Sequence, residues 1–173
     1  MKDLLGKIST YNLFNYLLPG ILFVFIAKDF TGYNFVQDND IYGAFLYYFI
    51  GMVISRVGSL VVEPILTSMK IIIIAEREKY IFASKKNDKI ELFLEINNTY
   101  RTIVAMFILL LLLKAYPYLQ YLWNINESET PLIVVILLLV IFLFAYHKQA
   151  NYIEEEIFIS SKDMRGKRHK RGL

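Results

Sequence analysis

The sequence predicts an all-α membrane protein: a four-transmembrane-helix bundle with helices extended into the cytoplasm. Hydrophobic residues make up 56% of the 173 residues, against roughly 45–50% in soluble domains, and the mean hydropathy is +0.42. Charged residues account for 20% of the chain, but they are concentrated in short segments that separate long apolar stretches. Such segregation is typical of membrane-spanning chains. The length is that of one domain, so we treat residues 1–173 as a single membrane domain.

Four apolar stretches are expected to cross the membrane as helices. A spanning helix needs roughly 17–25 residues to cover the hydrocarbon core, and stretches near this length occur at about residues 11–27, 41–62, 102–123 and 131–146. Pro19 and Gly20 interrupt the first stretch and no small-residue cleavage site follows it, so we interpret it as a retained span and not as a signal peptide. The fourth stretch is short, and we expect its helix to continue past Lys148.

Residues 63–101, between the second and third spans, are predicted to form a cytoplasmic helical hairpin. Pro64 lacks a backbone donor, so we expect a kink there and a helix that continues through Ile74. The polar stretch KKNDK is the expected turn. Asp88, followed three residues later by Glu91, matches a capping box at the start of the next helix. That helix is expected to lead directly into the third span.

The end of the chain is predicted to remain helical after it leaves the membrane. Thr130, which precedes Pro131, is the expected N-cap of the fourth span. Beyond that span, residues 147–173 are expected to form a cytoplasmic helical extension and a basic tail.

The distribution of lysine and arginine predicts the orientation. The first connecting loop, residues 28–40, has one lysine and three aspartates, and the last, residues 124–130, has two glutamates and no cation. The middle loop and the two ends of the chain contain the lysines and arginines, which the positive-inside rule places in the cytoplasm. We therefore expect a protein of the bacterial cytoplasmic (inner) membrane with its N-terminus and C-terminus in the cytoplasm.

Three charged residues within or at the edge of the spans are the candidates for a polar interior or a pore: Arg56, Glu63 and Lys114. Charges inside a membrane are costly and usually face a bundle interior or a water-filled cavity. Arg56 lies seven residues before Glu63, about two helical turns, so the two side chains are expected near one stripe of the helix. The alternative is that Arg56 and Lys114 extend to the nearest interface.

Small residues recur every four positions in the second span, at Gly51, Ser55 and Ser59. A ridge of small side chains lets another helix approach closely. This ridge is therefore a candidate helix-packing surface, either for a helix of the same protomer or for a second copy of the chain in a homo-oligomer.

The sequence has no catalytic or cofactor-binding motif, and we predict that the protein is not an enzyme. It contains no cysteine and two histidines, which excludes thiolate chemistry and leaves little for a His-based metal site. A glycine-rich phosphate loop, an HExxH pair and a GxSxG motif are all missing from it. We expect no cofactor and no metal.

The basic tail is the expected surface for anionic lipid headgroups or a partner protein. Each cation near a membrane surface is attracted to anionic lipids by about 1 kcal/mol. Aromatic residues interleaved with the cations, which favour nucleic-acid binding, do not occur here, so we do not expect direct contact with nucleic acid. The residues assigned to this surface are Arg165, Lys167, Arg168, Lys170 and Arg171.

The opening YNLFNYLLPGILFVF, together with four spans, a charged helical loop and a basic tail, resembles small membrane proteins of bacterial phage-defence loci. These include the membrane subunit of the Kiwa system, membrane accessory proteins of type VI CRISPR systems and transmembrane effectors of nucleotide-signalling defence. The resemblance implies an antiviral role as an oligomeric membrane sensor, anchor or pore that works with a soluble cytoplasmic partner. It implies no catalytic residue.

A second interpretation from a different functional class is a small channel or transporter subunit with a housekeeping role. The same intramembrane charges would then line a transport path. Neighbouring genes distinguish the two: a nuclease or nucleotide-cyclase gene favours defence, and a permease gene favours transport.

The orientation can be tested with single cysteines and a membrane-impermeant thiol reagent on intact cells. Because the chain has no native cysteine, each label reports one position. We expect Asp38→Cys and Glu127→Cys to react, and Lys86→Cys and Arg168→Cys to react only after the cells are permeabilised. Labelling at position 86 but not at position 38 would reverse the orientation.

Overall fold

The computed structural model describes residues 13–84, 86–87 and 89–171, with side chains up to residue 161. Within these ranges the chain forms helices, turns and short irregular segments, and no strand. Its elements, in order, are the π-helix η1 (Leu13–Leu17), α2 (Leu18–Thr31), α3 (Asp40–Val57), the π-helix η2 (Gly58–Val62), α4 (Glu63–Ser68), α5 (Arg77–Ser84), α6 (Lys89–Trp123), the 3-10 turn η3 (Glu127–Glu129) and α7 (Thr130–Arg171).

The prediction of four helices able to cross a membrane is confirmed by their length and composition. The candidate spans are Leu13–Thr31, Asp40–Ser68, Lys89–Trp123 and Glu127–Ser161. Each one contains the stretch expected from the sequence, apart from residues 11 and 12, which lie outside the described residues. The last three continue well past the apolar stretch at the ends that the charge pattern assigns to the cytoplasm.

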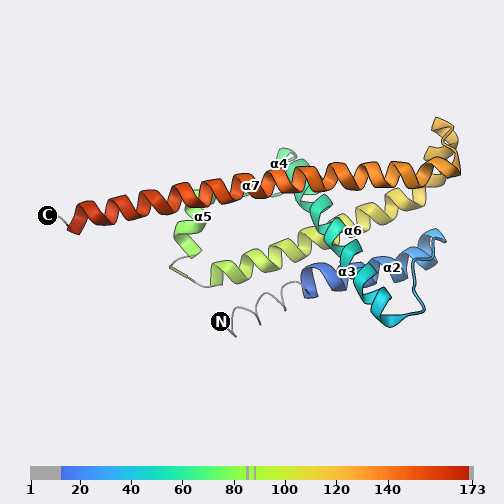
Figure 1. The fold of residues 1–173 in the computed structure, drawn as a ribbon, viewed down its shortest axis with the longest axis horizontal. Helices are drawn as coiled ribbons and strands as arrows, with labels where there is room; N and C mark the ends of the chain where they lie inside the picture. The colour runs from blue at the N-terminus through green and yellow to red at the C-terminus, as the bar shows by residue number, and fades with distance from the viewer. Residues whose placement is uncertain (1–12, 85, 88, 172–173) are drawn as a thin grey trace.

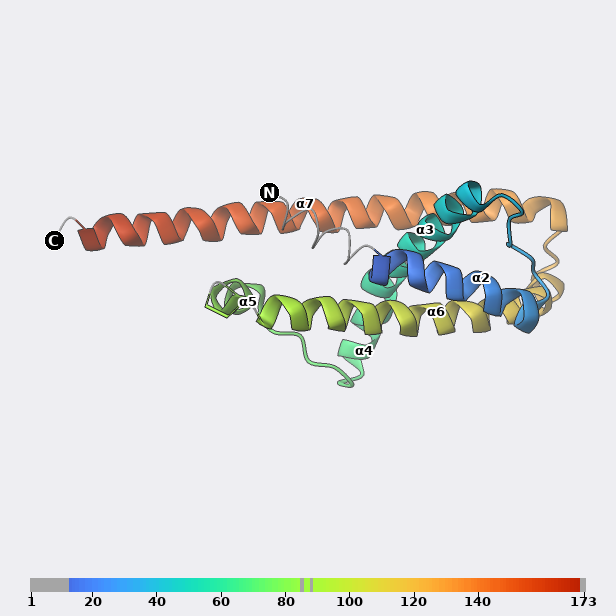
Figure 2. The same ribbon diagram turned by 90° about the horizontal axis from the view of Figure 1, so that it is seen from below.

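Helices α6 and α7 run in opposite directions along the long axis of the molecule, and α3 crosses them obliquely (Figures 1 and 2). The loop after α2 and the turn at η3 lie at one end of the molecule, and α5 lies toward the other (Figures 1 and 2). Helix α3 packs against α2 and α6 and also against α7. The long helix α7 extends beyond the other elements at its C-terminal end (Figures 1 and 2).

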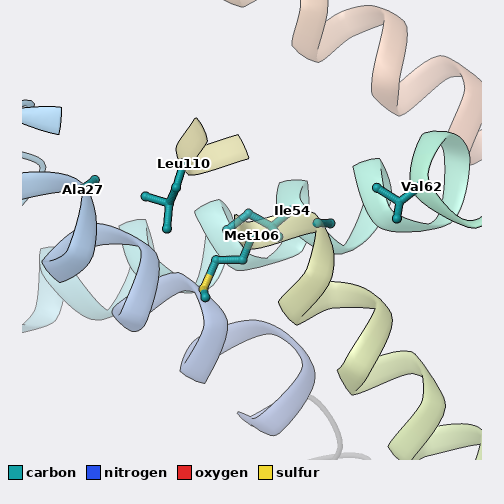
Figure 3. Packing of buried hydrophobic residues seen from close by; sticks show 6 residues of the cluster. Ala27, Ile54, Val62, Met106 and Leu110 are labelled. Atoms are coloured by element: carbon teal, nitrogen blue, oxygen red, sulfur yellow. The ribbon is translucent and has the colours of Figure 1, made fainter. Parts of the chain in front are cut away.

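Helices α2, α3 and α6 enclose the apolar core. Its buried side chains include Ala27 from α2, Ile54 from α3, and Met106 and Leu110 from α6, and Figure 3 shows them converging. Gly20 and Gly51 mark the crossing of α2 and α3. A Cβ atom at Gly20 would lie 1.8 Å from the carbonyl oxygen of Tyr47, so only glycine permits this approach of the two backbones.

Two π-helical turns precede two prolines in the spans. Residues Leu13–Leu17 lead into Pro19, and residues Gly58–Val62 lead into Pro64. A proline has no N–H for an α-helical bond to the carbonyl four residues back, so a widened turn is one way to accommodate it. The predicted kink at Pro64 therefore takes the form of a π-helical turn on the N-terminal side of the proline.

The prediction that this helix continues through Ile74 is wrong. Helix α4 ends at Ser68, and Lys70 has a left-handed φ of 59°. Four consecutive isoleucines then follow, and β-branched side chains are disfavoured in a helix by crowding against the preceding turn. The helical hairpin is thus shorter than expected: it begins at Arg77, with α5, and not at residue 63.

The helix starts also differ from expectation. Thr130 has helical φ and ψ, and the capping box before it is formed by Asn126 and Glu129, so the predicted N-cap at Thr130 is wrong. The 3-10 turn η3 lies between the observed cap residue, Asn126, and the predicted one, Thr130. The predicted cap Asp88 lies outside the described residues; the side chain of Asn87 accepts a hydrogen bond from the N–H of Lys89 at 3.0 Å.

Helix α7 is the least enclosed of the four spans. None of the residues in its most apolar window is buried within the described part of the protein, compared with 22–28% for the other three spans. The rings of Phe142 and Phe49 stack at 6.1 Å and provide one apolar contact to α3. Most of its other large apolar side chains, such as Leu132, Val135, Leu139 and Phe144, are exposed within the protomer.

Candidate functional site

Glu63 is the centre of a cluster of charges that joins three of the four spans. It lies at the start of α4, directly after η2. One of its carboxylate oxygens, Oε2, accepts a hydrogen bond from Nη1 of Arg101 on α6. The other, Oε1, lies 3.4 Å from Nζ of Lys148 on α7. The side chains of Glu63 and Arg101 are each 17% exposed, and that of Lys148 is 27% exposed. We call these three residues the charge cluster.

Lys148 adds a second connection between α7 and the second span. Its Nζ donates to the Ser59 hydroxyl at 2.8 Å and to the Ser59 carbonyl oxygen at 2.9 Å. The three donors of the ammonium group are therefore directed at Ser59 and Glu63. Lys148 thus joins α7 to the second span through polar contacts with two residues, Ser59 and Glu63.

The charge cluster lies near the inner boundary of the predicted bilayer. Its three residues are about 18 to 23 positions from the opposite, loop ends of their spans, which at 1.5 Å per residue is about 27–35 Å. The hydrocarbon core is roughly 30 Å thick. With the orientation that the charge pattern predicts, the cluster is at the level where the helices leave the hydrocarbon on the cytoplasmic side.

Arg56 does not belong to the charge cluster, although the sequence pattern pairs it with Glu63. Its Nη2 donates instead to the hydroxyl of Tyr16, at 3.0 Å. The π-helical turn η2 lies between Arg56 and Glu63, and five residues at the wider π-helical pitch rotate the following helix by about 90° relative to an α-helix. The two side chains therefore point to different sides of the span.

A buried set of hydrogen bonds connects the first three spans beside these charges. The side-chain nitrogen of Asn15 donates to Ser55 Oγ at 3.3 Å, and Oγ1 of Thr102 lies 3.0 Å from Asn15 Oδ1. All three side chains are at most 3% exposed. Asn15 belongs to η1, Ser55 to α3 and Thr102 to α6. Because each of these polar groups has a hydrogen-bond partner, it avoids the free-energy cost of burying an unpaired polar group in a low-dielectric interior.

The small-residue ridge of the second span is occupied within the protomer. Gly51 lies against the backbone of Tyr16, so that a Cβ atom there would be 1.7 Å from the Tyr16 carbonyl oxygen. Ser55 belongs to the buried hydrogen-bond set, and Ser59 accepts from Lys148. These contacts support the interpretation in which the ridge packs inside one protomer. An interface between protomers would therefore use another surface.

Lys114 lies apart from the other two candidate charges. Its side chain is exposed, and its Nζ lies 5.6 Å above the ring centre of Phe30. Phe30 is in the last turn of α2, near the loop end of the span. A cation above an aromatic face is weakly stabilised. In the protomer Lys114 therefore does not line the interior.

At the end of the molecule that the charge pattern assigns to the cytoplasm, α5 is connected to the extension of α7. The guanidinium of Arg77 stacks over the ring of Tyr152 at 4.0 Å and forms an ion pair with Glu155 at 3.3 Å. Burial raises the pKa of the nearby Tyr80 hydroxyl, and the Glu91 carboxylate raises it further. The side chains of the basic tail, including Arg165, Lys167, Arg168, Lys170 and Arg171, lie outside the described residues, and their backbone continues α7.

The described residues contain no group of three histidines, aspartates or glutamates placed to hold a metal ion. The chain matches no protein-family model, no curated protein and no solved structure. What the protein does must therefore be argued from its charges, its polar contacts and the shape of its helices.

Replacing Glu63 tests whether the charge cluster holds the spans together. Glu63→Gln keeps the volume of the side chain but leaves Arg101 and Lys148 without their carboxylate. We expect the free energy of unfolding in mild detergent to fall by about 3 kcal/mol, the lower end for a broken buried ion pair. Glu154→Gln, at an exposed position on α7, is the matched control and should change little. Equal stability of the two variants would show that the cluster does not hold the bundle together.

Proposed function

We propose that this protein is an integral membrane component of a bacterial antiphage defence system. In this proposal it acts as a membrane sensor or anchor that passes a change in the bilayer to a soluble cytoplasmic partner. The observation that supports this role best is helix α7, which is continuous from Thr130 to Arg171. One helix can connect the membrane interior to the cytoplasmic surface without a hinge.

The contacts of α7 are compatible with movement of this helix relative to the other spans. Inside the membrane it is held by one aromatic stack and by the polar contacts of Lys148 with Ser59 and Glu63. A change in bilayer thickness or tension alters the preferred tilt of a helix whose surface is mostly exposed to lipid. Such a change would displace α7 relative to α3, and the contacts of the charge cluster would oppose that displacement.

The cytoplasmic elements provide the surface on which a partner could detect that shift. The contact of Arg77 with Tyr152 and Glu155 connects α5 to α7, so a displacement of α7 would be passed to the α5–α6 hairpin. Exposed apolar residues on both sides of this contact, Phe82, Ile153 and Ile157, are 53–64% exposed. Apolar side chains exposed in this way suit a protein partner.

A pore formed by one protomer is the less favoured form of the proposal. Arg56 and Glu63 are bound to other polar side chains, Lys114 lies apart from both, and the three spans α2, α3 and α6 pack around an apolar core. Conduction would need several copies of the chain that assemble through their α7 helices. No residue in the most apolar window of α7 is buried within the described part of the protomer. We include assembly into a homo-oligomer through α7 in the proposal.

Breaking α7 just outside the bilayer tests the proposal. Ala150→Pro removes a backbone hydrogen bond from the exposed turn after Lys148 and kinks the helix, at a cost of about 3 kcal/mol. We expect the variant to insert into the membrane at normal levels but to lose protection in a phage plaquing assay with the complete locus. Ala150→Ser, at the same position, should keep protection within a factor of about two.

Full protection by Ala150→Pro would contradict transmission along α7. If the wild-type locus protects against no phage while purified protein passes ions in liposomes, the channel or transporter interpretation replaces the defence proposal.

A further inference from the structure

A small open hollow lies between the second span and α7, next to the charge cluster. Its lining residues are Arg56, Ser59, Leu60, Ala145, Lys148, Gln149 and Tyr152. Its lining therefore combines two cations and other hydrogen-bond donors with the apolar side chains of Leu60 and Ala145. Both elements that form it belong to candidate membrane spans.

The charges around this hollow do not balance. Two cations, Arg56 and Lys148, line the hollow, and none of its lining residues is a carboxylate. Lys148 is paired with the Glu63 carboxylate at 3.4 Å. Arg56 forms no ion pair with any described residue; its hydrogen-bond partner is the neutral hydroxyl of Tyr16. A half-buried cation without a paired carboxylate, at the edge of a low-dielectric medium, is costly unless an anion compensates it.

We propose that the hollow binds the phosphate of an anionic phospholipid of the inner leaflet, such as phosphatidylglycerol. Arg56 provides the charge and the planar donors that fit a phosphate oxygen pair, and Gln149 provides an amide donor. Leu60 and Ala145 accept the start of an acyl chain, which continues along the contact of Phe49 and Phe142. The inference goes beyond the proposed function, because it does not depend on any role in defence.

The position of the hollow favours a lipid over a soluble phosphate. It is level with Lys148, about 18 residues or 27 Å from the loop end of α7, which is close to the edge of a hydrocarbon core roughly 30 Å thick, next to the headgroup layer. A soluble phosphate would gain nothing from the apolar side chains of Leu60 and Ala145. A bound lipid would also fill the space between α3 and α7, and so stabilise the least enclosed span against the rest of the bundle.

The test is native mass spectrometry of the full chain from micelles that contain equal amounts of phosphatidylglycerol and phosphatidylcholine. We expect the wild type to retain phosphatidylglycerol preferentially. Arg56→Gln should lower that preference roughly fivefold, the effect of one cation near a lipid surface, and Arg56→Lys should keep most of it. Lys114→Gln, which removes a cation near the loop end of its span, is the matched control and should leave the preference unchanged.

Three results would overturn the proposal. The first is no preference for phosphatidylglycerol in the wild type. The second is an equal loss of preference in Lys114→Gln and Arg56→Gln. The third is displacement of the lipid by millimolar inorganic phosphate, which would make soluble phosphate the ligand. If Arg56→Gln does not fold, thermal unfolding of the wild type decides: phosphatidylglycerol should raise its Tm above that in phosphatidylcholine, and equal Tm values in both lipids reject the site.

Discussion

The Glu63 carboxylate is the constraint on which the arrangement of the spans depends. It is the acceptor for Arg101 and Lys148, and so it connects the second span to the third and to the fourth. Each of the three charges would be costly alone in a low-dielectric setting, and together they partly compensate one another. Because no described part of the apolar window of α7 is buried, the position of that helix depends on this carboxylate more than on apolar packing.

Several features of the first three spans position the Glu63 carboxylate for contact with α7. The Gly20–Gly51 crossing brings α2 and α3 into backbone contact, and the Asn15–Ser55–Thr102 hydrogen bonds connect both helices to α6. The π-helical turn before Glu63 then rotates the carboxylate away from the side of Arg56. The three-helix unit thus presents one negative charge to α7, which contributes no described residue to the apolar core.

Much of the fold could be predicted from the sequence, because the number, type and approximate limits of the spans follow from the length of the apolar stretches. The site could be predicted only in part. Glu63 was recognised as a candidate, but its partners are 38 and 85 residues away in the chain, and periodicity within one helix cannot indicate them. The expected pairing with Arg56 assumed a regular α-helix, and η2 invalidates that assumption. Asn15 and Thr102 are polar residues in apolar stretches, and that feature could have indicated them.

The most direct test of this account is a double-mutant cycle between Glu63 and Lys148. The free energy of unfolding is measured in mild detergent for the wild type, Glu63→Gln, Lys148→Met and the double variant. The cycle removes the separate contribution of the Lys148 contacts with Ser59 and leaves the energy of the pair. The account predicts a favourable coupling energy of at least about 1 kcal/mol. A coupling energy near zero would contradict it, because α7 would then be positioned without the carboxylate.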